Sequence, residues 1–289
     1  SALNKTELIA FIKKNKKKQN KKKVGGDGGE FNGVLNRVTL LELLENINED
    51  KLKKVQRLFL GDLHAEYVTF NTPYTFNTFN VSLRKLDENK IISTIQPNTF
   101  KGLTNLRYLD VGFNKIEILQ SKIFNGLTEL KYLYLNENQI KTIDPDTFNN
   151  LTNLKELDLS ENQITTIKTD TFNNLTNLKQ LNLNENQITN IQPDLFKNLI
   201  KLTSLNLDEN KINTIQPGVF NGLTNLQLLH LRSNENIKKI FPNTFNGLPN
   251  LQELYLGDNQ IETIKLGAFN GLPNLQELHL NGNKIITIE

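Results

Sequence analysis

The chain of 289 residues contains no cysteine, no methionine and no tryptophan, and it has only three histidines. Without cysteine it can form neither disulfides nor thiolate-ligated zinc sites, and the composition favours a reducing compartment. No apolar run approaches the roughly 18 residues that a membrane-spanning helix needs, and the N-terminal pattern is not that of a signal peptide. We therefore expect a cytoplasmic protein without a membrane span. Its lysine-rich run is also compatible with import into the nucleus.

Charge is distributed unevenly along the chain. Residues 1–60 hold 14 Lys and Arg against 7 Asp and Glu, a net charge of +7, which leaves −4 for the remainder because the whole chain carries +3. A basic N-terminal segment therefore precedes a mildly acidic body, and the two parts have different expected partners.

A lysine-rich run, KKNKKKQNKKK, occupies residues 13–23, and VGGDGGEFNG follows it. Like charges without an apolar anchor predict a flexible basic segment over residues 1–33 that ends in a glycine-rich linker. The run can bind nucleic acid, contact the acidic body of its own chain, or act as a solubilising tail, and these alternatives stay open. The candidate nucleic-acid or anion-binding residues are Lys13, Lys14, Lys16, Lys17, Lys18, Lys21, Lys22 and Lys23.

A repeat dominates the rest of the chain. Residues 151–167 read LTNLKELDLSENQITTI, and residues 175–191 read LTNLKQLNLNENQITNI. Upstream, Asn89 and the stretch KVQRLFL (54–60) fit as degenerate units. One unit cannot bury its apolar residues alone, so neighbouring units have to stack. The asparagine after each LxL pair recurs in steps of 24 residues, with one step of 25, at Asn114, Asn138, Asn162, Asn186, Asn210, Asn234, Asn259 and Asn283.

Each unit follows LxxLxLxxNxIxxIxxxxFxxL, which resembles the leucine-rich repeat over residues 81–289. The resemblance implies an α/β solenoid, a horseshoe with a parallel sheet on its concave side and irregular or 3₁₀ segments on its convex side. The asparagines are expected to bond corner backbone groups, and the phenylalanines from Phe124 to Phe269 to form a spine. The extra residue in SNENIKKI (233–240) predicts a local bulge. The repeat type and the composition rich in Asn, Lys and Ile are similar to those of leucine-rich repeat proteins of giant DNA viruses.

The two ends of the array differ. Residues 38–52 begin with a capping box and continue with apolar residues at helical spacing. We expect a helix near 39–49 within an N-terminal cap and degenerate first repeat over 34–80, followed by the leucine-rich repeat domain over 81–289. The final NKIITIE carries no polar cap, which predicts either truncation or coverage by another chain, for example through self-association.

The variable strand positions form the candidate binding surface; in LKELDLSEN they are Glu156, Asp158, Ser160 and Glu161. The position before the recurrent asparagine is glutamate in four successive repeats, which indicates either a docking strip for a basic partner or simple solvation of the sheet. Tyrosine and arginine are favoured interface anchors. The candidate partner-binding residues are Tyr108, Phe113, Tyr132, Tyr134, Glu137, Asp158, Glu161, Glu185, Glu209, His230, Arg232 and Tyr255.

Catalytic motifs are missing from the sequence: there is no Walker loop, GxSxG, HExxH or cysteine nucleophile. His230 and His279 are two strands apart, roughly 10 Å, which is too far to share a metal ion. We expect no enzyme activity, metal or cofactor, and favour recognition of an unidentified protein ligand on the concave face. A first alternative is a ubiquitin-ligase substrate adaptor, because residues 38–55 faintly resemble an F-box. A second is a structural or virion assembly protein. A third is nucleic-acid association through residues 13–23.

Overall fold

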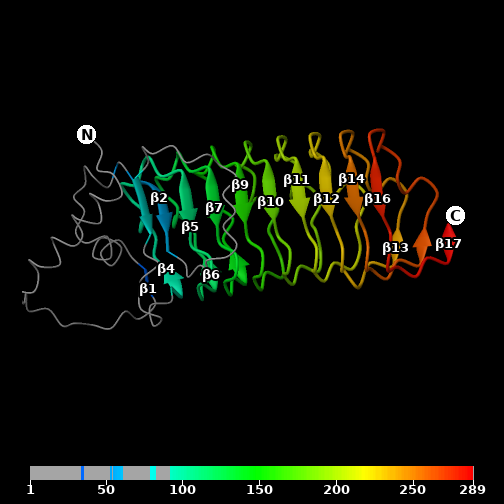
Figure 1. Ribbon diagram of the computed structural model, residues 1–289, viewed down its shortest axis with the longest axis horizontal. Helices are drawn as coiled ribbons and strands as arrows, with labels where there is room; N and C mark the ends of the chain where they lie inside the picture. The colour runs from blue at the N-terminus through cyan, green and yellow to red at the C-terminus, as the bar shows by residue number, and fades with distance from the viewer. Residues whose placement is uncertain (1–33, 36–52, 54, 61–78, 83–91, 289) are drawn as a thin grey trace, which may run out of the picture.

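The computed structural model describes residues 34–35, 53, 55–60, 79–82 and 92–288. These residues form a solenoid whose successive turns stack side by side (Figure 1). No helix occurs among the described residues, so this part of the chain is a parallel β-solenoid rather than an α/β one. The helix predicted near 39–49, the lysine-rich run at 13–23 and most of the F-box-like segment at 38–55 lie outside the described residues.

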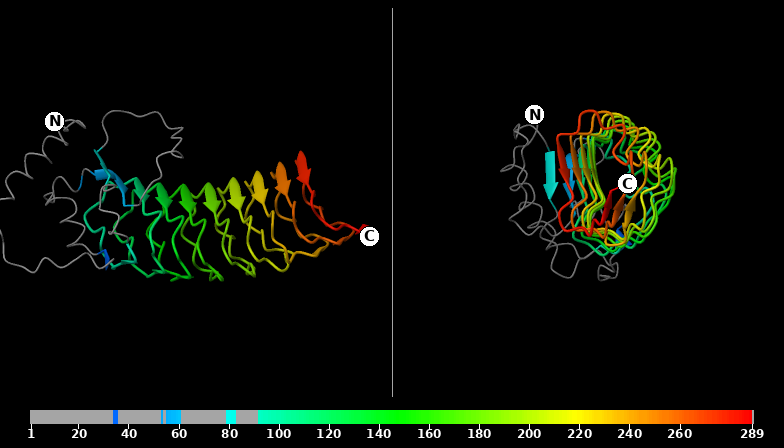
Figure 2. Two further views of the ribbon diagram at one scale, coloured as in Figure 1. Left: turned by 60° about the horizontal axis from the view of Figure 1, so that its bottom comes forward. Right: turned by 90° about the vertical axis from the view of Figure 1, so that its right-hand side faces the viewer.

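One ten-stranded parallel sheet runs along the gently concave side of the solenoid (Figure 2). Each strand pairs in register with its counterpart one repeat away, as Glu156 does with Gln180. An alignment column of the sequence therefore becomes a row across the sheet, with neighbours about 4.8 Å apart. The strands are β2 (Val55–Phe59), β3 (Phe79–Ser82), β5 (Tyr108–Asp110), β7 (Tyr132–Tyr134), β9 (Glu156–Asp158), β10 (Gln180–Asn182), β11 (Ser204–Asn206), β12 (Leu228–His230), β14 (Glu253–Tyr255) and β16 (Glu277–His279).

The opposite side consists of turns and two-residue strands, so among the described residues the expected irregular or 3₁₀ segments take the irregular form. The turns close through bonds such as Leu151 N–H to the Phe148 carbonyl, 3.0 Å. The short strands pair in parallel across repeats, which gives this side small ladders of its own. They are β1 (Val34–Leu35), β4 (Thr94–Ile95), β6 (Ile118–Leu119), β8 (Thr142–Ile143), β13 (Lys239–Ile240), β15 (Thr263–Ile264) and β17 (Thr287–Ile288).

The core is one continuous apolar column between the two sides. In a typical repeat Leu154, Leu157 and Leu159 are fully buried from the sheet side, and Phe172 is fully buried from the other. Phenylalanine rings of adjacent repeats stack from Phe100 to Phe172 and from Phe220 to Phe269, for example Phe148 on Phe172 with centroids 6.2 Å apart. Each ring is covered by the next repeat, which is why the unit requires stacking. The predicted spine is confirmed.

The recurrent asparagines satisfy the backbone at the corner where each strand ends. The Asn162 carbonyl oxygen accepts a bond from Ile140 N–H at 2.9 Å, one repeat earlier. Its amide donates to the carbonyls of Leu135, Leu159 and Ser160 at 2.9–3.1 Å. The side chain thus gives the buried Ile140 N–H its partner and adds a hydrogen bond to carbonyls that also have other donors, as Glu137 N–H donates to Ser160 O at 3.1 Å. The predicted asparagine ladder is confirmed.

The 25-residue step changes this pattern at one place. The backbone N–H of Asn234 itself donates to the Asn259 side chain at 2.8 Å. In the other repeats the donor is the N–H two residues after the recurrent asparagine, as Ile164 N–H donates to Asn186. The extra residue forms a turn, closed by Ile237 N–H to the Asn234 carbonyl at 3.0 Å. This turn is the predicted local bulge.

The N-terminal end of the sheet departs from chain order. β2 pairs with β5 on one side and β3 on the other, so β3 lies outside β2. Asn114 contacts the residues on both sides of the stretch 61–91. Its side-chain amide donates to the Leu60 carbonyl, and its side-chain oxygen accepts the Ile92 N–H. Leu60 and Ile92 therefore meet at one corner of the solenoid, and the degenerate unit of Asn89 lies outside the described residues.

Candidate functional site

The outward positions of β5 and β7 bring together the three predicted tyrosines Tyr108, Tyr132 and Tyr134, here called the tyrosine cluster. The ring of Tyr108 lies 5.1 Å from that of Tyr134 and 6.3 Å from that of Tyr132, between centroids. The Arg57 guanidinium stands 5.6 Å from the Tyr108 ring centre, a cation–π distance. Strand pairing places Arg57 there, since it registers with Tyr108.

Carboxylates of β9 adjoin the tyrosine cluster. The Tyr134 hydroxyl donates to Glu156 at 2.8 Å. Burial and the Glu156 carboxylate raise the pKa of Tyr134 far above its ordinary value. Burial also raises the pKa of Glu156 and of Asp158. This part of the face therefore holds a fixed phenol donor and carboxyl groups that bind protons more readily than usual.

Asp158 has an internal role that the sequence analysis did not assign. Its carboxylate accepts the N–H of Ser160 at 2.9 Å and the Ser160 hydroxyl at 2.6 Å, which closes a turn at the strand end. Ser160 is buried. The expectation that Ser160 displays its side chain on the surface is therefore wrong, because this turn folds the side chain back onto Asp158.

The glutamates before the recurrent asparagine lie at the corner after each strand, not on the strand. All have positive φ, which is strained for a residue with a Cβ. Burial, and then the neighbouring Glu137 and Glu185, raise the pKa of Glu161. Phe113 occupies the same corner position and does not lie on the strand with the tyrosines. The glutamate row consists of Glu137 (φ 50°), Glu161 (φ 52°), Glu185 (φ 51°) and Glu209 (φ 52°).

A second aromatic group, here called the ring stack, forms toward the C-terminal end. His230, Tyr255 and His279 register across β12, β14 and β16. The Tyr255 ring is parallel to both imidazoles, with centroids 4.6 Å from His230 and 4.4 Å from His279. Sheet spacing fixes this stack, because each ring stands on the next strand.

Carboxylates border the ring stack. The Tyr255 hydroxyl donates to Glu253 at 2.8 Å, and His279 Nε2 lies 3.1 Å from Glu277. The described residues contain no cluster of three or more His, Cys, Asp or Glu that could hold a metal ion.

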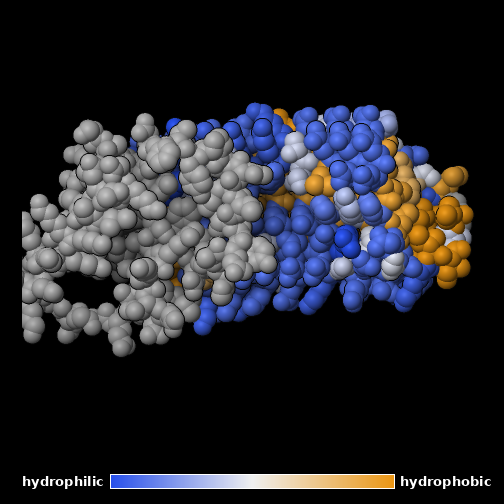
Figure 3. Space-filling model, in the orientation of Figure 1, coloured by the Kyte–Doolittle hydropathy of each residue, from blue (hydrophilic) through white to orange (hydrophobic). Residues whose placement is uncertain are grey.

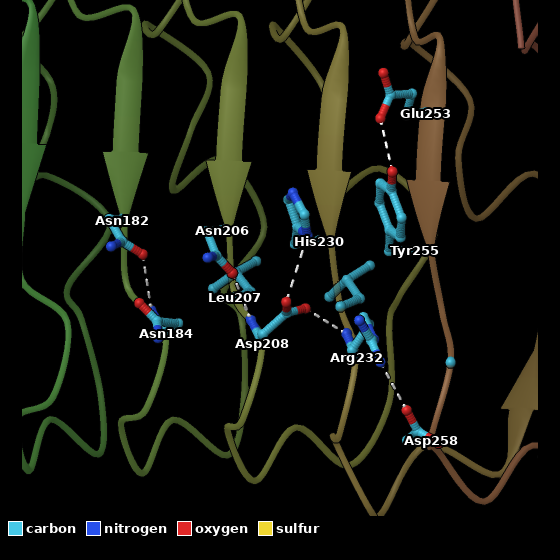
Figure 4. A network of polar contacts seen from close by, with 12 residues as sticks. Asn182, Asn184, Asn206, Leu207, Asp208, His230, Arg232, Glu253, Tyr255 and Asp258 are labelled. Atoms are coloured by element: carbon cyan, nitrogen blue, oxygen red, sulfur yellow. Dashed lines mark hydrogen bonds and ion pairs between the residues drawn. The ribbon is translucent and has the colours of Figure 1, made fainter. Parts of the chain in front are cut away.

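Asp208 links the ring stack to Arg232, and the sequence analysis missed this role (Figure 4). In the two preceding repeats an asparagine side chain on the strand accepts the backbone N–H of the residue two positions later. Asn206, for example, accepts the N–H of Asp208 at 2.9 Å. His230 replaces that asparagine, and the N–H of Arg232 bonds to the Asp208 carboxylate at 2.5 Å instead. The same carboxylate lies 3.4 Å from His230 Nδ1, which is buried without a hydrogen bond. The signal in the sequence is that, in the eight repeats from Asn114 to Asn283, Asp208 is the carboxylate in a column otherwise filled by Gly, Asn, Ser and Arg.

Arg232 extends from this network toward the corner of the next repeat. Its guanidinium bonds the Asp258 carboxylate at 3.0 Å, and both side chains are exposed. The predicted His230, Arg232 and Tyr255 therefore lie in one connected group, separate from the tyrosine cluster.

A row of cations precedes the strands in the N-terminal half, and the sequence analysis also missed it. Main-chain bonds fix its spacing: Lys155 N–H donates to Lys131 O, and Lys179 N–H to Lys155 O, both at 2.8 Å. Within the described part of the chain no ion pair engages these cations. Later repeats carry Thr or Gln at this position. The basic row consists of Arg107, Lys131, Lys155 and Lys179.

Apolar side chains are exposed at the C-terminal end of the solenoid (Figure 3). Leu266 is 83% exposed, Ile286 84% and Ile288 78%. Self-association through this end stays a prediction. No helix in the described part is both long enough and apolar enough to cross a membrane.

Comparison with known proteins assigns the family. The leucine-rich repeat profile matches residues 83–140, 128–188, 176–235 and 224–285. Because these matches cover more than half of the sequence, the chain belongs to the leucine-rich repeat family. No curated protein sequence matches the chain.

Two solved structures illustrate the likeness. A chain in a crystal structure of a TLR13–ssRNA13 complex is 30% identical, with a TM-score of 0.59 over 66% of this chain and 32% of that one. A chain in a structure of the Toll–Spatzle complex of Drosophila is 24% identical, with a TM-score of 0.54 over 66% of this chain and 30% of that one. This protein therefore spans about a third of the length of these two chains.

Proposed function

We propose that the protein is a non-enzymatic recognition module that binds a protein partner on the concave face of its parallel sheet. The carrying observation is the pair of aromatic groups on that face, the tyrosine cluster and the ring stack. Repeat proteins use such extended concave surfaces for binding. Aromatic anchors contribute a large contact area, and rings already packed on one another lose little entropy on binding.

The spacing of the two groups suggests that they contact separate parts of one partner. Uncharged side chains, among them Asn182, Asn184 and Asn206, lie between them on β10, β11 and the turns that follow. These three side chains add uncharged hydrogen-bonding groups to this middle zone, whose charges lie at the corners on Glu185, Asp208 and Glu209. Binding at two separated anchors gives a surface of the size that stable protein complexes need.

Nucleic-acid binding is the second candidate. It is favoured by the likeness to a chain solved with single-stranded RNA, and by the lysine-rich run at 13–23, which suits phosphates. The glutamate row and the carboxylates of β9 oppose a polyanion on the concave face. We therefore assign any nucleic-acid contact to the lysine-rich run and protein recognition to the sheet. We further propose a cytoplasmic location, which rests on the absence of cysteine.

The test compares two faces of the molecule in capture from eukaryotic cell extract. The bait is the full chain, the variant Tyr108→Ala/Tyr132→Ala, or Leu266→Ala, which truncates an exposed apolar side chain outside the concave sheet. We expect specific proteins to be retained by the native chain and by Leu266→Ala, and lost with the tyrosine variant. Retention of the same proteins by all three baits would contradict concave-face recognition. Loss only when residues 13–23 are deleted would instead favour the nucleic-acid candidate.

A further inference from the structure

Two rows of opposite charge border the N-terminal half of the concave face. The basic row stands one residue before each strand, and the glutamate row stands three residues after it. Within one repeat, Lys155 and Glu161 are six residues apart, which separates the rows by about 20 Å at most. Between them lie the tyrosine cluster and the carboxylates of β9. A ligand seated on the tyrosines therefore meets cations on one flank and anions on the other.

The spacing within each row is that of successive helical turns. Neighbouring strands are about 4.8 Å apart, so four charges in a row span about 14 Å. In an α-helix, residues i, i+3, i+7 and i+10 lie on one flank and span about 15 Å. An extended strand lying along the same axis repeats its side chains every 6.6–6.8 Å or so and loses register after two contacts.

We propose that the partner presents an α-helix that lies along the solenoid axis, with acidic residues facing the basic row and basic residues facing the glutamate row. Apolar side chains between these flanks would contact the tyrosine cluster. This inference rests on the proposed recognition by the concave face and specifies its ligand. A helix is about 10–12 Å wide with its side chains, so long charged side chains on both flanks reach the two rows.

Charge arrangement also explains why a protein fits better than a nucleic acid. A polyanion satisfies the basic row but meets the glutamate row together with Glu156 and Asp158. A helix with segregated flanks satisfies both rows at once. Its end-to-end reversal would place like charges opposite each other, so the rows select one direction of the helix. The glutamates repel one another in the free protein, and a basic flank would relieve that repulsion.

The probes are fluorescent helical peptides of about 18 residues and identical composition. In the segregated peptide, Glu occupies one flank, Lys the opposite flank, and Leu the stripe between them. In the mixed peptide, Glu and Lys alternate along both flanks. A fluorescent single-stranded RNA of about ten uridines is the third probe. Binding to the full chain is followed by anisotropy at low and at physiological salt.

Two double variants with the same net charge locate the effect. Lys131→Glu/Lys155→Glu reverses the centre of the basic row, and Lys168→Glu/Lys197→Glu changes two exposed lysines outside both rows. We expect the native chain to bind the segregated peptide about tenfold or more tighter than the mixed one. The preference should persist in the Lys168/Lys197 variant and disappear in the Lys131/Lys155 variant. Circular dichroism verifies that both variants are folded.

Equal binding of the two peptides, binding of neither, or a preference that survives reversal of Lys131 and Lys155 would overturn the proposal. RNA binding that is lost with the Lys131/Lys155 variant would assign the basic row to nucleic acid and overturn it too. These results leave the proposed function separately testable. If cellular proteins still require Tyr108 and Tyr132 while the peptides show no preference, the helical ligand is wrong and the concave face is right.

Discussion

The ring of Tyr255 lies parallel to the imidazole of His230, at 4.6 Å between centroids and 4° between planes. The same ring covers His279 on its other side at 4.4 Å. One phenol thus links three strands on the exposed face of the sheet, and its position is set by main-chain pairing rather than by core packing. Truncation of Tyr255 therefore tests whether the ring stack stabilises the last repeats.

We expect Tyr255→Ala to lower the urea midpoint of unfolding, because it removes two stacking contacts at once. The matched control is Tyr255→Phe, which keeps both contacts and loses only the hydroxyl bond to Glu253. Its midpoint should stay near that of the native chain. Equal midpoints for the alanine and phenylalanine variants would show that the stack contributes no stability.

Removal of a corner asparagine has a larger expected cost. Asn162→Ala leaves the buried Ile140 N–H without its partner. It also removes one of two hydrogen bonds from each of three backbone carbonyls, which keep their bonds to Asn138, Asn186 and Glu137. An unsatisfied buried group costs about 1–3 kcal/mol and each lost hydrogen bond adds to that, so we expect a loss of about 2–3 kcal/mol in the free energy of unfolding. Urea titration measures this loss.

The control for Asn162 is an exposed asparagine of the same repeat. Asn153 makes one bond, to the Thr128 carbonyl at 2.9 Å, at the solvent-facing surface. Asn153→Ala should cost below about 1 kcal/mol because water replaces the lost bond. Similar losses for both variants would mean that burial does not govern the asparagine ladder.

The positive φ of Glu161 predicts a stabilising substitution. Asparagine tolerates the left-handed region better than glutamate and removes a charge from the glutamate row. We expect Glu161→Asn to stabilise the protein by about 0.5–1 kcal/mol. Glu161→Ala separates the two causes, since it removes the charge and keeps the strain. If both substitutions stabilise equally, charge repulsion alone accounts for the effect.

The regular parts of the fold followed directly from the sequence. Leu157, Asn162 and Phe172 each recur at one period, and stacking of identical units leaves a single way to bury them. The corner strain at Glu161 did not follow, because a sequence period identifies a column but not the backbone dihedral angle in it. The helix near 39–49 is a local pattern without a repeat, and it lies outside the described residues.

The parts of the candidate site that were missed depend on single departures from the repeat. Asp208 matters because His230 cannot close the turn that Asn206 closes one repeat earlier. The basic row was overlooked because Lys155 precedes the strand, whereas the expected binding positions lie within the strand and after it. The place of β2 between β5 and β3 breaks the order of the chain, and a periodic pattern predicts only pairing in chain order.

Carboxyl groups on the sheet give a pH dependence with a definite sign. Burial raises the pKa of Glu156 and Asp158 in the folded state above their ordinary values of 4.5 and 3.8. Between the ordinary and the raised value the folded protein binds more protons than the unfolded chain, so stability falls as pH rises through that window. Their contribution is therefore fully present below the ordinary values and is lost above the folded-state pKa.

We expect acidification from pH 7 toward pH 4 to stabilise the native chain more than the variant Glu156→Gln/Asp158→Asn, in which these two groups no longer titrate. The measurement is the free energy of unfolding in urea at several pH values for both proteins. Taking the difference between them cancels the groups that they share, including the three histidines. A difference that stays constant from pH 7 to pH 4, or that changes in favour of the variant on acidification, would show that these carboxyls are not destabilised in the folded state. The face beside Tyr134 would then be better hydrated than its burial indicates.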